Sequence, residues 1–277
     1  MSDRLQERLQ LDDVGNDRFS SSAPGAPVNI YGGELAAHAL VAANMTVTDD
    51  RLPHSLHCTY LAAGDPAHGL EHQVTRIRDG RSFSVRRVDV FNGGRLSVSA
   101  TVSYQTKSAG VEHRRTAPRV PCPDDLPTFH GASNAAWIPW AEENPELEMR
   151  VAPHDPGDSL GRRTFWLKIR HDPAIGSADD LLEAAYAAYA SDFTMIASIR
   201  LPHEEPDVKT HVMTTLTHSL YFHKPFAASQ WHLVDHWSPA AAGGRGLSIA
   251  HAYNASGDLT MTAVQESLVR SASKKAG

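Results

Sequence analysis

Two stretches of the chain repeat one pattern: DGRSFSVRRVDVFNGGRLSVSATVSYQ at residues 79–105 and GGRGLSIAHAYNASGDLTMTAVQESL at residues 243–268. Each contains Gly-Arg, then a segment in which apolar and polar residues alternate, a glycine turn and a second alternating segment. Alternation with a period of two is typical of a strand that is buried on one face. Both stretches are therefore predicted to be β-hairpins. They differ at one inward position, where the first has Val102 and the second has Gln265.

The elements around the two hairpins recur in the same order, one helix and then four strands. The first set is a helix over 34–47 and strands over 54–61, 70–79, 82–92 and 95–105. The second is a helix over 178–198 and strands over 212–223, 231–238, 246–254 and 258–270, preceded by a strand over 163–170. His-Ser-Leu at 54–56 and Gly-Arg at 80–81 both recur 164 residues later, and the offset becomes 163 after the glycine turn. This spacing predicts an internal duplication.

A mostly apolar helix followed by antiparallel strands has to cover the one apolar face of its sheet. The pattern resembles the hot-dog fold. It predicts an α+β double hot-dog, with two antiparallel sheets each wrapped around a long helix. The expected parts are an N-terminal segment that begins irregularly (1–27), a first hot-dog (28–110), a linker with a short helix near 134–143 (111–160), and a second hot-dog (161–277).

The composition is that of an ordinary globular protein. The 277 residues are 41% hydrophobic and 21% charged, with a formal net charge of −6, so nothing favours nucleic acid or an anionic membrane as a partner. No apolar run approaches the length of a membrane span. The start, MSDRLQERLQLDD, lacks the apolar core of a signal peptide, and two cysteines cannot make a disulfide framework, so a cytoplasmic location is expected. Cys58 is expected to be a buried thiol.

Two polar residues fall on faces that are otherwise apolar. Asp192 continues a stripe on the second predicted helix that contains Ala185, Tyr189 and Ile196. Gln265 alternates in phase with the apolar residues of the last strand, Leu259, Met261 and Ala263. Each residue alone has a structural explanation. Asp192 would bond nearby backbone groups, and Gln265 would lie at the edge of the core. The two residues together make a chemical site more plausible than either residue alone does.

Six segments resemble the acyl-CoA thioesterase II family and cover roughly residues 28–106 and 185–270. They are YGGELAAHALVAA (31–43), RLPHSLHCTYLAAGD (51–65), RIRDGRSFSVRRVDVFNGG (76–94), YASDF (189–193), THSLYFHKPF (217–226) and AVQESLVR (263–270). In that family an aspartate, a serine or threonine, and a glutamine hold a hydrolytic water. The resemblance implies that Asp192, Thr215 and Gln265 are the catalytic residues, with acyl-CoA as substrate and no cofactor or metal.

The chain departs from the family pattern at Tyr31, where Phe is usual, at Glu34, where Gln is common, and at Thr217, where Asp commonly precedes His-Ser. The last two bear on substrate preference and efficiency more than on reaction type. The inward phase of Thr215 stays open, because residues 214, 215 and 217 are all threonine.

Thioester hydrolysis needs a water beside a carboxylate that takes its proton, and donors for the charge that develops on the carbonyl oxygen. Asp192 fits the base, and Thr215 and Gln265 fit the groups that orient the water. Main-chain N–H groups at the glycine-led start of a helix would polarise the carbonyl. Because the first repeat has Val102 and no aspartate in its helix, a single site in the second repeat is expected.

Other motifs fit hydrolase or metal chemistry less well. Ser159 in GDSLG (157–161) matches a nucleophile motif, but a proline-rich segment precedes it instead of a strand. His232 and His236 lack a third metal ligand and are expected at the surface. His218 cannot activate the adjacent Ser219, since neighbours on a strand face opposite ways. The arginines at 76, 78, 81, 86 and 87 fit either CoA phosphates or a solvated strand face.

Two alternative functions remain. One is a non-catalytic acyl-CoA-binding hot-dog protein, and the other is a hydratase-like hot-dog acting on enoyl-CoA. A hydratase would want Asp and His in one loop, and no histidine lies within five residues of Asp192. Association into a homo-oligomer depends on which sheet edges are left exposed.

Overall fold

A computed structural model describes residues 4–22, 29–48, 50–128, 144–153, 160–170, 179–203 and 211–271. The helices are α1 (Arg4–Leu9), α2 (Gly32–Asn44), α4 (Asp180–Ser191) and α5 (Met195–Arg200), with a 3-10 turn η1 (Pro123–Asp125). The first six strands are β1 (Asp12–Gly15), β2 (Arg18–Ser21), β3 (Arg51–Tyr60), β4 (Leu70–Asp79), β5 (Phe83–Asn92) and β6 (Arg95–Thr106). The others are β7 (Leu147–Val151), β8 (Arg163–Ile169), β9 (His211–Phe222), β10 (His232–Ala242), β11 (Arg245–Tyr253) and β12 (Leu259–Ser271).

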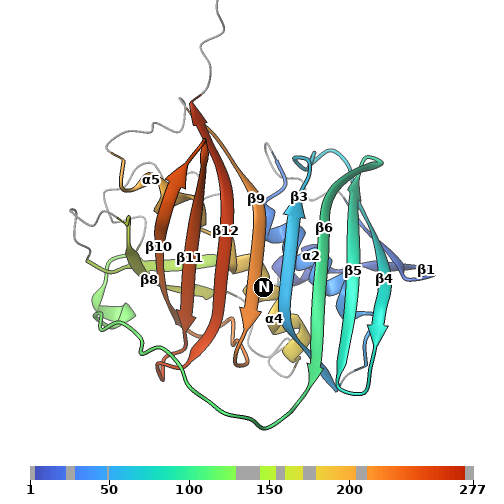
Figure 1. The fold of residues 1–277 in the computed structure, drawn as a ribbon, viewed down its shortest axis with the longest axis horizontal. Helices are drawn as coiled ribbons and strands as arrows, with labels where there is room; N and C mark the ends of the chain where they lie inside the picture. The colour runs from blue at the N-terminus through green and yellow to red at the C-terminus, as the bar shows by residue number, and fades with distance from the viewer. Residues whose placement is uncertain are drawn as a thin grey trace, which may run out of the picture.

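All twelve strands belong to one antiparallel sheet, in the order β1-β2-β4-β5-β6-β3-β9-β12-β11-β10-β8-β7 (Figure 1). The expectation of two separate sheets is therefore wrong. The two halves join where β3 pairs with β9, with Leu56 opposite Leu220. An unpaired strand edge exposes a row of backbone donors and acceptors, and pairing β3 with β9 removes two such edges at once.

The helices lie on one side of this sheet, behind it in the view of Figure 1. Alanines on α2 and α4, among them Ala36, Ala39, Ala185 and Ala188, are completely buried, so the two helices pack closely against each other. α2 covers β4, β5 and β6, whereas α5 covers β9, β10 and β11. Within the ranges described above, no helix has the length and apolar character that crossing a bilayer requires.

The second helix is broken, although one helix over 178–198 was expected. α4 ends at Ser191 and α5 starts at Met195, and between them Thr194 has φ of 72°. A β-branched residue rarely adopts this left-handed conformation, so the surrounding contacts must hold it there. The break turns the chain immediately after Asp192, which leaves the Asp192 side chain at the end of a helix and not on its flank.

The N-terminal segment is more ordered than expected. α1 buries Leu5 and Leu9, and the β1–β2 hairpin buries Phe19 and extends the sheet beyond β4. The predicted linker likewise contains β7, which pairs with β8. The short helix predicted near 134–143 lies outside the described residues.

Strand pairing also corrects the alignment of the two repeats, here called the first repeat (residues 32–106) and the second repeat (residues 180–271). Val102 pairs with Leu56, whereas Gln265 pairs with His218. If Val102 corresponds to Gln265, then Leu56 corresponds to His218, and the two His-Ser-Leu segments are two residues out of step. Val88 and Val90 correspond on the same basis to Ala250 and Ala252, since their partners on β6 and β12 also correspond.

Candidate active site

Asp192 lies where the two repeats meet. It is the C-terminal cap of α4, and its half-buried side chain points to the start of α2. There Oδ2 accepts a hydrogen bond of 3.1 Å from the backbone N–H of Gly33. The carboxylate of the second repeat is thus held by the backbone of the first.

Thr215 bonds the same carboxylate directly, and Gln265 is connected to it through Thr215. The hydroxyl of Thr215 donates to Oδ1 of Asp192 at 3.3 Å. Nε2 of Gln265 donates to Oγ1 of Thr215 at 3.2 Å and to Oγ of Ser267 at 3.2 Å. The structure therefore brings together all three residues that the sequence singled out, in one hydrogen-bonded chain from β12 through β9 to the end of α4.

A β-bulge explains why the phase of Thr215 could not be predicted. Glu266 and Ser267 are adjacent on β12, but they pair with Thr217 and Thr215, so Leu216 is an extra residue on β9. A bulge shifts the alternation of side chains by one. As a result, Thr215 and His218 are both buried although they are three residues apart.

Two glycines allow the close approach of α2 to Asp192. A Cβ atom on Gly33 would lie 2.3 Å from the backbone oxygen of Tyr189, and one on Gly32 would lie 2.8 Å from Oδ2 of Asp192. The hydroxyl of Tyr60 donates to the Gly32 oxygen at 2.7 Å. Any larger residue at these positions would push the helix start away from the carboxylate.

The environment of Asp192 suits a base that works near neutral pH. Burial raises the pKa of the Asp192 carboxyl to about 6, and the hydrogen bonds from Thr215, Gly33 and Gln265 act in the opposite direction. A general base is most effective when its pKa lies close to the working pH. The carboxyl is thus mostly ionised at neutral pH and still a stronger base than an exposed aspartate.

This pKa predicts the acid limb of the pH profile. If Asp192 acts as base, kcat/KM for an acyl-CoA should fall about tenfold per pH unit below about pH 6, because the carboxylate becomes protonated. The measurement is thiol release between about pH 4.5 and 8, with the melting temperature recorded at each pH to exclude unfolding. A rate that stays constant down to about pH 4.5 would contradict the assignment.

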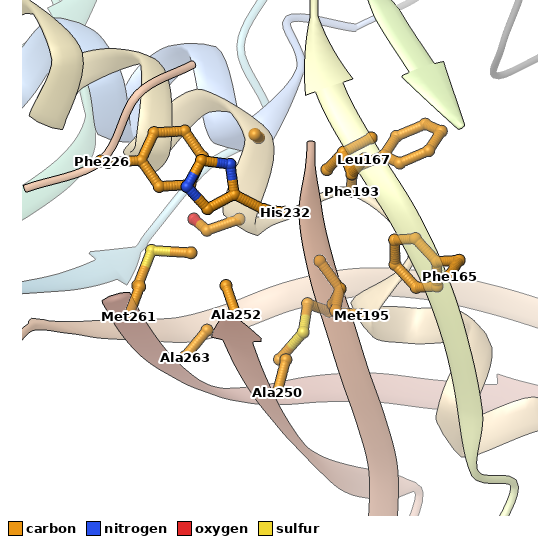
Figure 2. A pocket seen from close by; sticks show the side chains of 13 residues that line it. Phe165, Leu167, Phe193, Met195, Phe226, His232, Ala250, Ala252, Met261 and Ala263 are labelled. Atoms are coloured by element: carbon orange, nitrogen blue, oxygen red, sulfur yellow. The ribbon is translucent and has the colours of Figure 1, made fainter. Parts of the chain in front are cut away.

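An apolar cavity lies between the broken helix and the second half of the sheet (Figure 2). Ser191 and Phe193, the two chain neighbours of Asp192, belong to its lining. The other lining residues come from α4, α5, the loop before β10 and strands β8, β10, β11 and β12, and Figure 2 shows Phe165, Met195, Phe226, Ala252 and Met261 around the space. Its volume is about 20 Å³.

The first repeat carries a different set of side chains at the corresponding place. Asn44 ends α2 and donates from Nδ2 to the oxygen of Leu181 near the start of α4, at 3.1 Å, as Asp192 contacts the start of α2. Val102 stands where the second repeat has Gln265. Tyr104, the counterpart of Ser267, donates from its hydroxyl to Oδ1 of Asn44 at 2.7 Å. An amide, a valine and a bulky tyrosine therefore replace the carboxylate and its donors.

His232 and His236 are buried, so the expectation that they lie at the surface is wrong. Both point to the inner face of β10, where His232 stacks on Phe226 with centroids 3.9 Å apart and His236 meets the edge of Phe165. Burial lowers their pKa values to about 4 and about 3. Residues four apart on a strand share a face, and here that face is the core. Among the described residues, no three His, Cys, Asp or Glu side chains are placed to bind a metal.

The remaining candidates have structural surroundings of their own. Arg86 is buried and donates to Thr46 and Asp79, so it is not available for phosphates. Arg76 and Arg87 form ion pairs with aspartates, while Arg78 and Arg81 are exposed. Ser159 lies outside the described residues.

Glu34 and Thr217, two of the residues that depart from the family pattern, have contacts with residues other than Asp192. Glu34 is buried and forms an ion pair with Arg8 at 3.4 Å. Thr217 is half-buried and pairs with Thr59 on β3. Cys58 is confirmed as a buried thiol, and burial raises its pKa to about 12.

Three residues near the carboxylate escaped the sequence analysis as individual contributors: Gly33, Ser191 and His218. Gly33 was noted only as part of a glycine-led helix start. Oγ of Ser191 lies within hydrogen-bond distance of the backbone oxygen of Ala188, at 2.7 Å, and of Nε2 of His218, at 2.8 Å, and the side chains of Ser191 and His218 are both buried. Ser191 and His218 come together only where α4 meets β9, and neither segment has a sequence pattern that indicates this contact.

Comparison with known proteins gives one consistent answer. Residues 21–105 match the model of the acyl-CoA thioesterase N-terminal domain, and residues 123–269 match that of the acyl-CoA thioesterase C-terminal domain. The chain is 32% identical to acyl-coenzyme A thioesterase 8 of Homo sapiens, over 95% of this chain and 87% of that protein.

Solved structures agree with the sequence matches. An acyl-CoA thioesterase II from Mycobacterium marinum superposes with a TM-score of 0.82 at 29% identity, covering 99% of both chains. A protein described as having the hot-dog fold, from Alicyclobacillus acidocaldarius, superposes with a TM-score of 0.76 at 19% identity, covering 98% of this chain and 100% of that one. The fold is therefore the hot-dog fold.

Proposed function

Because the chain belongs to the acyl-CoA thioesterase family, we propose that it hydrolyses acyl-CoA to free fatty acid and CoA with a water activated by Asp192. The observation that carries this proposal is the hydrogen-bonded chain Gln265–Thr215–Asp192, which ends on a carboxyl whose pKa is raised to about 6. A partly buried carboxylate with oriented polar neighbours is the arrangement that general-base hydrolysis requires.

The reaction proceeds in two stages. Asp192 takes a proton from the water while the oxygen attacks the thioester carbonyl, and Thr215 and Gln265 hold the water in line through their hydrogen bonds. The negative charge on the carbonyl oxygen faces the N-terminal end of α2, where the helix dipole favours an anion. The carbon–sulfur bond then breaks, and the thiolate of CoA takes the proton from Asp192.

We place the acyl chain in the apolar cavity between the broken helix and the sheet. A volume of about 20 Å³ has room for one or two water molecules, so a longer chain has to displace lining side chains. Met195 and Met261 are the unbranched ones and change rotamer most readily. The cavity exists where the second repeat has Ala250 and Ala252, at the positions where the first repeat has Val88 and Val90.

This placement predicts the effect of Ala252→Val. The added methyl groups would fill the cavity, so kcat/KM for a long-chain acyl-CoA should fall by about tenfold or more, while hydrolysis of acetyl-CoA changes little. The measurement is thiol release across a panel of acyl-CoA chain lengths. Val90→Ala, the reverse exchange at the corresponding position of the first repeat, is the matched control and should leave the chain-length profile unchanged. Equal losses on all chain lengths for Ala252→Val would contradict the placement.

The same panel tests the proposed reaction itself. Release of free thiol at a rate that depends on Asp192 supports hydrolysis. Saturable binding of CoA without any thiol release would instead indicate a non-catalytic acyl-CoA-binding protein, and hydration of enoyl-CoA would indicate a hydratase.

We propose further that the chain is a double hot-dog, with one hot-dog over residues 28–110 and the other over 161–277, preceded by the N-terminal segment 1–27 and connected by the linker 111–160. The support is the recurrence of one helix and four antiparallel strands in each repeat. The cytoplasmic location and the homo-oligomer stay predictions.

A further inference from the structure

A row of inward side chains crosses the centre of the sheet beneath the site. Cys58 on β3 is opposite His218 on β9, His218 is opposite Gln265 on β12, and Gln265 is opposite Ser248 on β11. All four are buried, with at most 2% of their surface exposed. Directly opposite residues on antiparallel strands have Cβ atoms about 4.5–5.5 Å apart. His218 and Gln265 are therefore immediate neighbours.

The hydrogen bonds of Gln265 are unevenly satisfied. Its Nε2 donates to Thr215 and Ser267, whereas its Oε1 has no partner within hydrogen-bond geometry. His218 has the complementary deficit, because Nε2 lies 2.8 Å from Ser191 Oγ while Nδ1 has no partner. Fully buried polar atoms in native proteins nearly always have partners, so the two unpaired atoms on these adjacent side chains are expected to pair with each other.

The orientation of the Gln265 amide decides how Thr215 can act. With Nε2 toward Thr215, the threonine oxygen accepts from the amide and its single proton is donated to Asp192. If the amide were turned over, Oε1 would face Thr215 and would compete with Asp192 for that proton. Asp192 would then lose one of the donors that hold it, and the water would lose its oriented neighbours.

We propose that His218 is a positioning residue, which as the neutral Nδ1–H tautomer donates to Oε1 of Gln265 and holds the amide with Nε2 toward Thr215. The inference rests on the proposed function of Asp192, Thr215 and Gln265. Oγ of Ser191 lies 2.7 Å from the backbone oxygen of Ala188 and 2.8 Å from Nε2 of His218, and a hydroxyl has one proton. In this arrangement that proton goes to Nε2 and not to Ala188, which ties the imidazole to the residue next to Asp192.

The charge state of His218 agrees with this role. Burial lowers the pKa of His218 to about 4, against the opposing effect of the nearby Gln265 side chain, so the imidazole is neutral at working pH. Its neighbour on the other side, Cys58, is a neutral thiol because burial raises its pKa to about 12. A neutral imidazole has one N–H, and the choice between Nδ1 and Nε2 is what fixes the amide.

Two substitutions separate the two nitrogens of His218. The amide of Asn lies near the position of Nδ1, and the amide of Gln lies near that of Nε2. His218→Gln should therefore keep the Ser191 contact but lose the donor to Gln265, and kcat should fall by about 10²-fold with KM changed less than about twofold. His218→Asn keeps a donor to Gln265 and should be at least about tenfold faster than His218→Gln. Cys58→Ala, on the other side of His218, is the control and should keep its kcat.

A double-mutant cycle tests whether His218 acts through Gln265. Once Gln265→Val has removed the amide, His218→Gln should cost little further activity, because the group that it positions is gone. Independent, multiplicative losses would overturn the proposal, as would equal activities of the Asn and Gln variants. Asp192→Asn is assayed in parallel: full activity of that variant refutes the proposed function, whereas its loss together with an active His218→Gln refutes only this inference.

Because His218 is buried, its variants have to be compared at matched folded fractions. A further measurement observes the tautomer in the wild-type protein. Two-bond ¹H–¹⁵N correlation spectra of the protein with ¹⁵N-labelled histidine distinguish the two neutral tautomers. The expected result is the Nδ1–H pattern for His218, assigned by its absence in His218→Asn. The Nε2–H pattern would overturn the proposal.

Discussion

Replacing Asp192 with asparagine is expected to lower the rate of acyl-CoA hydrolysis by about 10²–10⁴-fold, the range that a general base contributes. Asparagine has nearly the same volume and can still accept the N–H of Gly33, so the fold should persist. It cannot take a proton from water. The measurement is thiol release at saturating and subsaturating acyl-CoA, and we expect the loss in kcat with little change in KM.

The same substitution is expected to stabilise the protein at alkaline pH. The pKa of Asp192 is raised in the folded state, so the wild type is most stable relative to its unfolded state when this carboxyl is protonated, and that stability is lost as pH rises through about 6. Asparagine stays neutral. Asp192→Asn should therefore unfold with a free energy about 3 kcal/mol higher than wild type at pH 8, and the difference should shrink toward pH 4.

Asp180→Asn is the matched control, because Asp180 is an exposed carboxylate on the same helix, in the first turn of α4. It should change neither kcat nor the pH dependence of stability in this way. If Asp192→Asn turns over acyl-CoA at a near-normal rate, Asp192 is not the base, and the raised pKa belongs to a structural carboxyl.

Replacing Gln265 with valine is the second change with a large expected effect. It copies the residue of the first repeat and removes the amide that donates to Thr215 and Ser267. Turnover should fall by about 10²-fold, the scale for loss of one positioned donor. The folded protein should keep most of its stability, because valine replaces a fully buried polar side chain with an apolar one.

Gln265→Met is the control for volume, since methionine fills more of the space but offers no amide, and it should be as slow as Gln265→Val. The reciprocal change, Val102→Gln, should create no second site, because Asn44 and Tyr104 occupy the corresponding place in the first repeat. Melting temperature and thiol release are measured for all three variants together. Full activity of Gln265→Val, or failure only through unfolding, would make Gln265 a structural residue.

The strands were predictable because their residues alternate on a period that only a half-buried strand satisfies. The bounds of β4 agree with the prediction, and those of β5 and β6 differ by one residue. Joining β3 to β9 in one sheet was not predictable, since backbone hydrogen bonds between segments about 160 residues apart leave no local pattern. Similarly, α1 is six residues long and buries only Leu5 and Leu9, too few to show a helical period.

The candidate site, too, was predictable from the sequence only in part. Asp192 and Gln265 were predicted to face inward from spacing alone, because each continues an apolar stripe. The phase of Thr215 could not be read, because the bulge at Leu216 changes the period within the strand. The Gly33 contact and the place of His218 arise where α2, α4 and β9 meet, and only the folded chain brings these three together.

The contact between Asp192 and Gly33 has a consequence for how such a protein can change over generations. In a homodimer of one repeat, every substitution appears twice, so a tyrosine at position 104 or an asparagine at position 44 would spoil both symmetry-related sites. Encoding the repeats in one gene gives each half its own codons while keeping them in equal amounts in one molecule. The first half can then lose its own site residues and be selected to supply the backbone donor for the carboxylate of the second half.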